Sequence, residues 1–184
     1  MKTIKVPSKE QVSLESQAIF EQIKKGIGKV PNLYAVMGYS ANALKGFLAF
    51  EENLSHGVFT AKEREAIALA VSETNGCDYC VAAHTQIALK KGFALEETFL
   101  IRSGELIDPK LNAVILLAKS IAENSGSPKN ELLQTFFSFN YKEGALVELI
   151  GLVTARIFTN YLFAATNIPI DFPLAQALNS AEKY

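Results

Sequence analysis

A helical hydrophobic period runs along almost the whole chain and limits the folds open to it. Apolar residues recur at every third or fourth position, and no segment alternates apolar and polar residues as a half-buried strand would. Clusters of glycine and proline interrupt the pattern, for example at residues 125–128. We therefore expect an all-α helical bundle, with helices over roughly residues 12–25, 41–56, 60–75, 77–92, 95–105, 109–124, 129–138, 144–166 and 173–181.

The composition suits a helical protein with a large apolar interior. The chain has 184 residues, 49% of them hydrophobic, and its mean hydropathy is +0.14. This length suits one domain over residues 1–184, with possible repeat halves at about 1–106 and 107–184. The surplus of apolar residues suggests a homo-oligomer whose subunits bury apolar faces against one another.

The possible halves rest on an internal similarity. A gapless overlay of residues 148–167 on residues 65–84 pairs Glu148 with Glu65 and Ala165 with Ala82. In this register the second copy keeps the helical scaffold and lacks the thiols of the first. A degenerate helical repeat is one interpretation of the overlay.

The charge balance gives no electrostatic reason to expect nucleic acid or a membrane as a partner. The chain has 18 basic and 19 acidic residues, for a formal charge of -1. Its first residues lack the apolar stretch of a secretory signal. Glu148 and Arg156 interrupt the most apolar segment, residues 145–170, which favours a buried helix. We expect a cytoplasmic protein that binds neither nucleic acid nor membrane.

Both cysteines and one of the two histidines lie within residues 75–84. On a helix that turns about 100° per residue, Cys77, Cys80 and His84 share one side. Gly76 can end the preceding helix and leave both cysteines in the first turn of the next one, where free N–H groups and the helix dipole favour a thiolate. In a reducing compartment such a pair is seldom a structural disulfide. We therefore expect a redox-active pair.

His84 and Glu65 are the groups expected to move protons beside the thiols. His84 lies one helical turn beyond Cys80, where it could take the Cys80 proton or stabilise the thiolate. If the helices on either side of Gly76 fold back as a hairpin, Glu65 lies level with His84 and could orient the imidazole or relay protons. Cys77 is close enough to Cys80 to close a disulfide afterwards. Cys80, Cys77, His84 and Glu65 are thus the candidate catalytic residues.

Two other uses of these residues stay open. In a general disulfide oxidoreductase, Cys77 would attack first. In a non-enzymatic helical oligomer, the thiols would sense oxidation or, together with His84 and Glu65, bind a metal such as zinc. The order of cysteine reactivity separates the two enzymatic interpretations, and the metal content of the purified protein tests the third.

The spacing of Glu65, the Cys77-Asp78-Tyr79-Cys80 motif and His84 resembles the Glu, CxxC and His signature of alkylhydroperoxidase D (AhpD)-like proteins in the carboxymuconolactone decarboxylase superfamily. Residues 30–34 and 167–173 further resemble the peroxidase-related branch of that superfamily. The resemblance covers nearly the whole chain. The combined spacing of the glutamate, the CxxC motif and the histidine is much more specific than a CxxC motif alone.

The resemblance implies an all-helical fold, assembly into a dimer, trimer or hexamer, and thiol-dependent reduction of hydroperoxides without a cofactor. It further implies that Cys80 is the peroxidatic thiol and passes through a sulfenic acid, that Cys77 resolves it to a disulfide, and that His84 and Glu65 form a proton relay. An unknown thiol reductant would restore the dithiol.

In two respects this sequence departs from the rest of the superfamily. Tyr79 occupies the place of a second histidine in AhpD proper, and a tyrosine cannot serve as a base near neutral pH. The decarboxylase branch lacks the cysteine pair, so decarboxylation is not expected.

Overall fold

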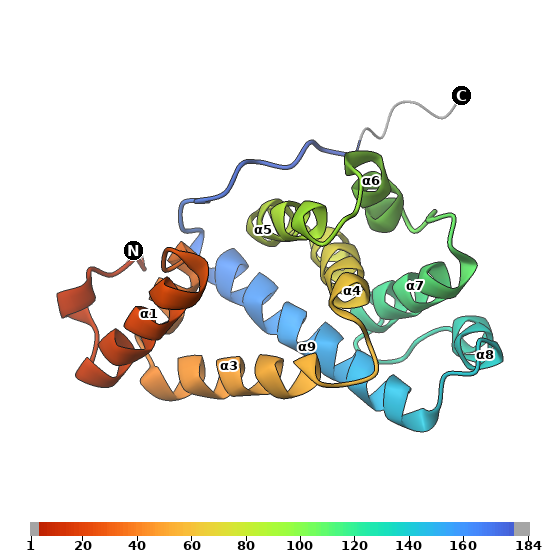
Figure 1. Cartoon of the computed structure of the whole chain (residues 1–184), viewed down its shortest axis with the longest axis horizontal. Helices are drawn as coiled ribbons and strands as arrows, with labels where there is room; N and C mark the ends of the chain where they lie inside the picture. Colours follow the sequence, from red (N-terminus) through yellow and green to blue (C-terminus); the bar gives the residue numbers. More distant parts are fainter. Residues whose placement is uncertain (1–3, 179–184) are drawn as a thin grey trace.

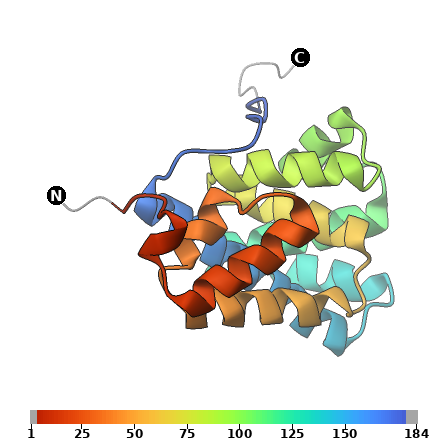
Figure 2. The same cartoon turned by 60° about the vertical axis from the view of Figure 1, so that its left-hand side comes forward.

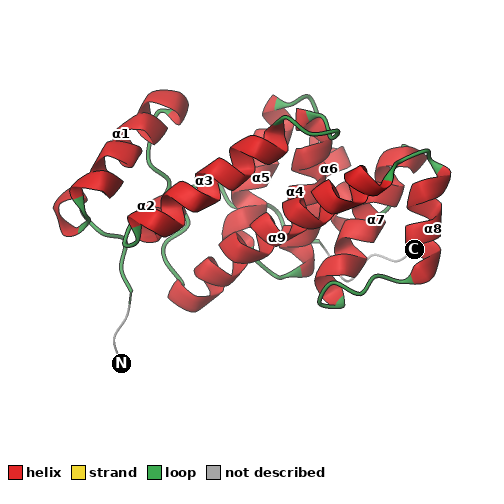
Figure 3. Ribbon diagram, turned by 90° about the horizontal axis from the view of Figure 1, so that it is seen from below, coloured by secondary structure: helices red, strands yellow, loops and turns green. Residues whose placement is uncertain are grey.

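The computed structural model describes residues 4–178, and these residues form helices joined by loops, without any strand (Figure 3). A 3-10 turn at Lys9–Gln11 precedes the first helix. The helices are α1 (Leu14–Ile27), α2 (Asn32–Met37), α3 (Ala41–Ser55), α4 (Ala61–Thr74), α5 (Asp78–Lys90), α6 (Leu95–Ser103), α7 (Pro109–Glu123), α8 (Asn130–Ser138) and α9 (Glu143–Thr166). The expected all-α fold is confirmed.

The helix boundaries follow local sequence signals. Side-chain oxygens accept hydrogen bonds from backbone N–H groups of the first turn at the N-caps of α1, α3, α4 and α7, which are Ser13, Ser40, Thr60 and Asp108. In α7 the cap is followed by Pro109 at the first helical position, where its missing N–H costs nothing. Such caps satisfy backbone donors that have no partner within the helix.

Helix α9 runs through the middle of the molecule and contacts α3 on one side and α4 and α7 on the other (Figure 1). The largest apolar core lies among α4, α6, α7, α8 and α9 and includes Leu69, Ile115, Leu117, Phe136 and Leu149, all fully buried. By length and composition alone, α9 could cross a membrane, since its most apolar window has a mean hydropathy of 1.4. In this fold one side of α9 supplies the core.

Two smaller clusters complete the interior. One joins α1, α2 and α3 to α9 and includes Phe20, Met37 and Phe47. The other contains both cysteines, packed with Leu33 of α2 and with Ile168 just after α9. The thiols therefore lie where α2, α5 and the end of the chain meet.

Residues 168–178 form an extended segment that we call the C-terminal strap. It leaves the end of α9, passes over α5 and reaches α6 (Figures 1 and 2). The expected helix at 173–181 is wrong for residues 173–178, and the remainder lies outside the described residues. The carbonyl of Gln176 accepts a hydrogen bond from the Arg102 side chain of α6, so the strap is tethered to the bundle and does not close its own helical turn here.

The structure also differs from the sequence-based expectations at α2 and at the proposed internal overlay. No helix was expected between residues 25 and 41, but Pro31 is the N-cap of α2, and its carbonyl accepts the first helical hydrogen bond from Ala35. Residues 65–84 fold as a helical hairpin, whereas residues 148–166 belong to a single helix. The gapless overlay therefore does not describe two copies of one structural unit.

Candidate thiol site

The turn between α4 and α5 places the two thiols. Gly76 adopts a left-handed conformation with φ of 61°, which an L side chain adopts only with strain. Cys77 is then the N-cap of α5, and its N–H donates to the carbonyl of Ser72 at 2.9 Å. Cys80 follows in the first turn. Both cysteines are free and buried, each with 2% of its surface exposed.

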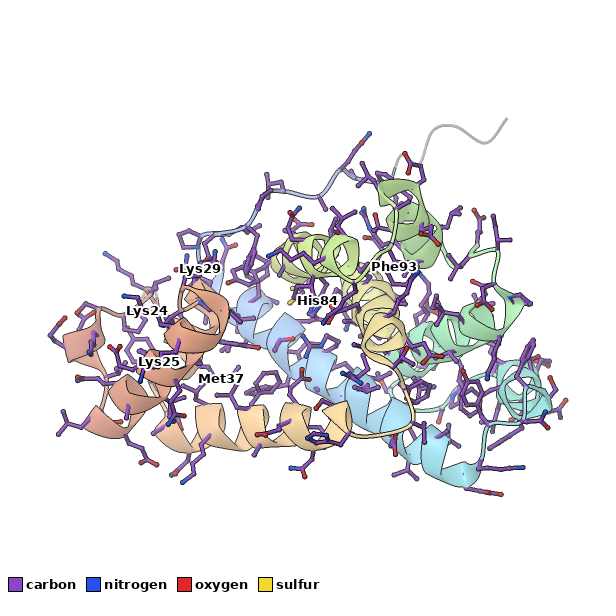
Figure 4. All side chains as sticks on the ribbon, viewed as in Figure 1. Lys24, Lys25, Lys29, Met37, His84 and Phe93 are labelled. Carbon is purple, nitrogen blue, oxygen red and sulfur yellow. The ribbon has the colours of Figure 1, made fainter. Side chains whose placement is uncertain are left out.

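The hairpin brings Glu65 and His84 together, as the sequence predicts. Nδ1 of His84 lies 2.7 Å from Oε2 of Glu65, in the space between α4, α5 and α9 (Figure 4). Burial alone would raise the pKa of Glu65. The hydrogen bond from Nδ1 of His84, together with the positive charge of Arg156, outweighs burial and holds that pKa below its ordinary value. Glu65 therefore stays a carboxylate.

Two residues that the sequence analysis did not assign to the site complete this network. Arg156 of α9 donates from Nη1 to Nε2 of His84 at 2.7 Å and from Nη2 to Oε1 of Glu51 at 2.6 Å. Its side chain is almost completely buried. A buried guanidinium requires nearby acceptors, and here two carboxylates and an imidazole surround it.

Arg156 also limits what His84 can do. A guanidinium has only donors, so Nε2 of His84 must be the acceptor, and the ring proton is on Nδ1 facing Glu65. Both ring nitrogens are therefore engaged with groups other than the Cys80 thiol. No hydrogen bond joins His84 to Cys80 within the described residues, so in this arrangement His84 does not take the Cys80 proton directly.

Cys80 interacts instead with Thr159 of α9 and with the Cys77 thiol. Its Sγ lies 3.8 Å from Oγ1 of Thr159, one turn beyond Arg156 on the same helix. The pKa of Cys80 is lowered to about 6, chiefly by the hydrogen bond from the Cys77 thiol. Burial opposes this shift, while the positive charge of Arg156 supports it. The same pairing raises the pKa of Cys77, so one thiol holds the proton for both.

Cys80 and this polar network line one cavity of about 530 Å³. Its other walls are mainly apolar and come from the end of α1, from α2, from α5 and from the strap; they include Ile27, Leu33, Tyr34, Ile87 and Phe172. This volume can hold a small organic molecule. We call it the Cys80 cavity.

The strap is fixed beside this cavity through Asp171. Tyr79 donates its hydroxyl to Oδ1 of Asp171 at 2.6 Å, and Nζ of Lys29 lies 2.9 Å from Oδ2 (Figure 4 labels Lys29). Burial alone would raise the pKa of Asp171, but these two hydrogen bonds hold it below its ordinary value. The segments 30–34 and 167–173, far apart in sequence, therefore lie side by side. Tyr79 anchors the strap through its hydrogen bond to Asp171. Within residues 4–178 its hydroxyl makes no hydrogen bond to His84.

The candidate residues are not gathered into one metal-binding group. Within residues 4–178, no group of three or more His, Cys, Asp and Glu side chains is arranged to hold a metal ion. The four candidate residues thus form two groups, the thiol pair and the Glu65–His84 pair, with Arg156 between the second pair and α3.

Residues 41–122 match the carboxymuconolactone decarboxylase family. Similar solved structures include a cysteine-to-alanine variant of the debrominase Bmp8 in complex with 2,3,4-tribromopyrrole, with a TM-score of 0.78 and 16% identity over 93% of this chain and 92% of that one. An uncharacterized peroxidase-related protein from Ralstonia eutropha JMP134, described as an alkylhydroperoxidase AhpD core, has a TM-score of 0.76 and 20% identity over 86% of both chains.

A second peroxidase-related protein, from Silicibacter sp. TM1040, has a TM-score of 0.76 and 19% identity over 94% of this chain and 93% of that one. No curated protein matches the chain significantly. At these identities the solved structures show a shared fold. Together with the family match, they confirm the resemblance that the Glu, CxxC and His spacing indicated.

Proposed function

We propose that this chain, an AhpD-like member of the carboxymuconolactone decarboxylase superfamily, is a thiol-dependent peroxidase that reduces organic hydroperoxides. The observation that carries the proposal is the Cys80 thiol, which lines an organic-sized cavity and has a pKa of about 6. At neutral pH such a thiol is mostly thiolate, and the thiolate is the reactive form of cysteine.

In the first step the Cys80 thiolate attacks the terminal oxygen of the hydroperoxide. The O–O bond breaks, Cys80 becomes a sulfenic acid, and the departing alkoxide takes a proton to leave as an alcohol. That proton comes from solvent and is passed on by the relay of Glu65 and His84, which line the same cavity, while the fixed charge of Arg156 stabilises negative charge on sulfur and oxygen.

In the second step Cys77 resolves the sulfenic acid. Its sulfur bonds to Sγ of Cys80, the hydroxyl of the sulfenic acid takes the Cys77 proton, and water leaves. The interaction between the two thiols supports this step, because the raised pKa of Cys77 keeps its proton near the Cys80 sulfur. A thiol reductant must then return both cysteines to thiols.

The raised pKa of Cys77 disfavours the alternative in which Cys77 attacks first. A second candidate function comes from the debrominase Bmp8, which shares this fold and was solved with 2,3,4-tribromopyrrole. The Cys80 thiolate could remove bromine from a bromopyrrole that binds in the mainly apolar Cys80 cavity: the C–Br bond breaks, the ring carbon takes a proton from solvent, and Cys80 becomes a sulfenyl bromide. Cys77 then attacks the Cys80 sulfur, loses its proton and expels bromide as the disulfide forms. The same assay can test both substrates.

The decisive experiment counts free thiols before and after one equivalent of cumene hydroperoxide, with products mapped by mass spectrometry. We expect rapid loss of both thiols to a Cys77–Cys80 disulfide. Cys80→Ser should abolish hydroperoxide consumption, and Cys77→Ser should stop after one turnover at a sulfenic acid. Multiple turnovers in either variant would exclude the mechanism. Bromide release from 2,3,4-tribromopyrrole with no reaction toward the hydroperoxide would favour the second candidate.

A further inference from the structure

The two thiols line two different cavities. Cys80 lines the cavity described above, to which Cys77 contributes nothing. Cys77 lines a second cavity of about 360 Å³, to which Cys80 contributes nothing. We call this second space the Cys77 cavity. A disulfide between the two residues would therefore be reachable from two directions, with a different sulfur presented to each.

The Cys77 cavity has one fixed wall and one formed by the strap. Helices α4, α5 and α6 supply Glu73, Val81 and Arg102, and the opposite wall is formed by strap residues within 174–178. Arg102 joins the two walls: its Nε donates to Oε2 of Glu73 and its Nη1 to the carbonyl of Gln176, each at 2.7 Å. The Leu174 side chain on the strap is 73% exposed, so this wall packs little against the bundle.

Disulfide chemistry gives the two sulfurs different roles. A thiolate that attacks a disulfide bonds to one sulfur and expels the other, and expulsion is faster when the departing thiol has the lower pKa. The positive charge of Arg156 lowers the pKa of Cys80 and is still present when Cys77 is part of a mixed disulfide, so Cys80 is the better leaving group. Attack is therefore favoured at Cys77, the sulfur that lines the second cavity.

We propose that the Cys77 cavity binds the thiol reductant, and that it is separate from the cavity through which the hydroperoxide reaches Cys80. This inference rests on the disulfide step of the proposed function. The reductant thiolate bonds to Sγ of Cys77 and the S–S bond breaks, leaving Cys80 as a thiolate. A second thiol of the reductant then attacks the reductant sulfur, which releases Cys77 as a thiol and the reductant as its own disulfide.

The charges around the cavity indicate the class of reductant. Glu73 and Asp78 contribute carboxylates, and Arg102 contributes a cation that is already paired with Glu73. Asp78 thus leaves a negative charge near Cys77, which disfavours an anionic thiol such as glutathione. A reductant without negative charge therefore fits this site better than an anionic one.

The test measures reduction independently of peroxidase activity. The disulfide is made with diamide, and its reduction by dithiothreitol is followed in Ala177→Trp and Val81→Phe, which narrow the Cys77 cavity from the strap and from α5. Both should slow reduction about tenfold or more while leaving disulfide formation by cumene hydroperoxide nearly unchanged. The matched control Ile87→Trp narrows only the Cys80 cavity and should show the reverse pattern.

A second measurement identifies the attacked sulfur. Brief treatment of the oxidised protein with 2-mercaptoethanol, followed by acid quench and peptide mapping, should give the mixed disulfide on Cys77. Glutathione should reduce the protein more slowly than dithiothreitol at equal thiolate concentration. Mixed disulfide on Cys80, or reduction rates unaffected by both cavity variants, would overturn the inference. Failure of hydroperoxide to oxidise the thiols would instead exclude the proposed function. The reduction test would still give a result, because its disulfide is made with diamide.

Discussion

Arg156 donates a hydrogen bond to Nε2 of His84 at 2.7 Å, and this contact fixes the tautomer of the histidine and places a permanent positive charge near the Cys80 thiol. The imidazole then links Arg156 to Glu65 through its Nδ1 proton. Activation of the thiol therefore depends on α9 as well as on the hairpin that carries the thiols. Glu51 of α3 holds the other side of the guanidinium.

Arg156→Leu should destabilise the protein and weaken the Cys80 thiolate. It leaves the Glu51 carboxylate without its cation and Nε2 of His84 without a donor, and loss of a hydrogen bond to a charged group typically costs about 1.5 to 3 kcal/mol. The pKa of Cys80 should rise, as measured by thiolate absorbance against pH, and urea unfolding gives the stability change. The control is Arg64→Leu, since Arg64 donates only to the carbonyl of Phe59 within the described residues. An unchanged thiolate titration would remove Arg156 from the site.

The rate of disulfide formation with hydroperoxide should rise with pH to half its maximum near pH 6 and level off above it, because the pKa of Cys80 is about 6. In the unfolded chain the pKa of this thiol is about 8.5. Between this value and the folded pKa of about 6, Cys80 therefore binds fewer protons in the folded state than in the unfolded state. The stabilisation from this thiolate is thus complete above about pH 8.5 and is lost as pH falls toward 6. Rapid-quench kinetics between pH 5 and 9 test the rate profile, and a half-maximum near pH 8.5 would contradict it.

Asp171→Asn should loosen the strap. The substitution removes the ion pair with Lys29 and weakens the acceptor of the Tyr79 hydroxyl, contacts worth about 1 to 3 kcal/mol together. In hydrogen exchange followed by mass spectrometry, residues 168–178 of the variant should exchange faster than the same residues of the wild type. The exchange rates of α4 and α7 should change less. Asp78→Asn removes a carboxylate that makes no ion pair within residues 4–178 and serves as the control. Equal exchange in the two variants would show that Asp171 does not hold the strap.

Gly76→Val should cost stability through the backbone alone. Gly76 has φ of 61°, and a Cβ there would meet no atom within 4 Å. A left-handed conformation costs an L residue about 1 to 2 kcal/mol, and Asn tolerates it better than a β-branched residue does. Thermal unfolding should therefore rank the wild type above Gly76→Asn and Gly76→Val lowest. A Val variant as stable as the wild type would mean that the turn relaxes to a different conformation.

The expected homo-oligomer can be tested at a groove between α3 and α9. Phe50 and Phe158 line this groove and are 42% and 41% exposed, which is high for aromatic side chains. We expect the double variant Phe50→Glu and Phe158→Glu to shift the protein toward monomers in sedimentation velocity, with its helical circular dichroism unchanged. Exposed Val58→Glu, outside the groove, is the control. An unaltered assembly would place the subunit contact elsewhere.

The parts of the fold that follow from local signals could be predicted from the sequence. Caps and glycines set the ends of the long helices, and the hairpin argument found Glu65 beside His84 because both lie on helices joined by one short turn. Helix α2 was missed because six residues are too few to show a hydrophobic period. The strap was mistaken for a helix because its position depends on tethers to Arg102, Tyr79 and Lys29, which no local pattern reveals.

Arg156 and Glu51 are the most important site residues that were not predicted from the sequence. The sequence analysis treated Arg156 only as an interruption of an apolar segment, although an arginine in such a helix must find acceptors when the helix is buried. Nothing in the sequence says that these acceptors are His84 and Glu51, since the contacts join residues 72 and 105 positions apart. Long-range packing of α3 and α9 against the hairpin decides that part of the site.

The separate cavities at Cys77 and Cys80 also determine how the two substrates affect each other in the steady state. In a peroxidase with one shared pocket, a high concentration of reductant occupies the space that the peroxide needs, and the turnover rate falls. Here each substrate would meet its own sulfur from its own side. Such a protein would follow a double-displacement rate law and keep its turnover rate at saturating concentrations of both substrates.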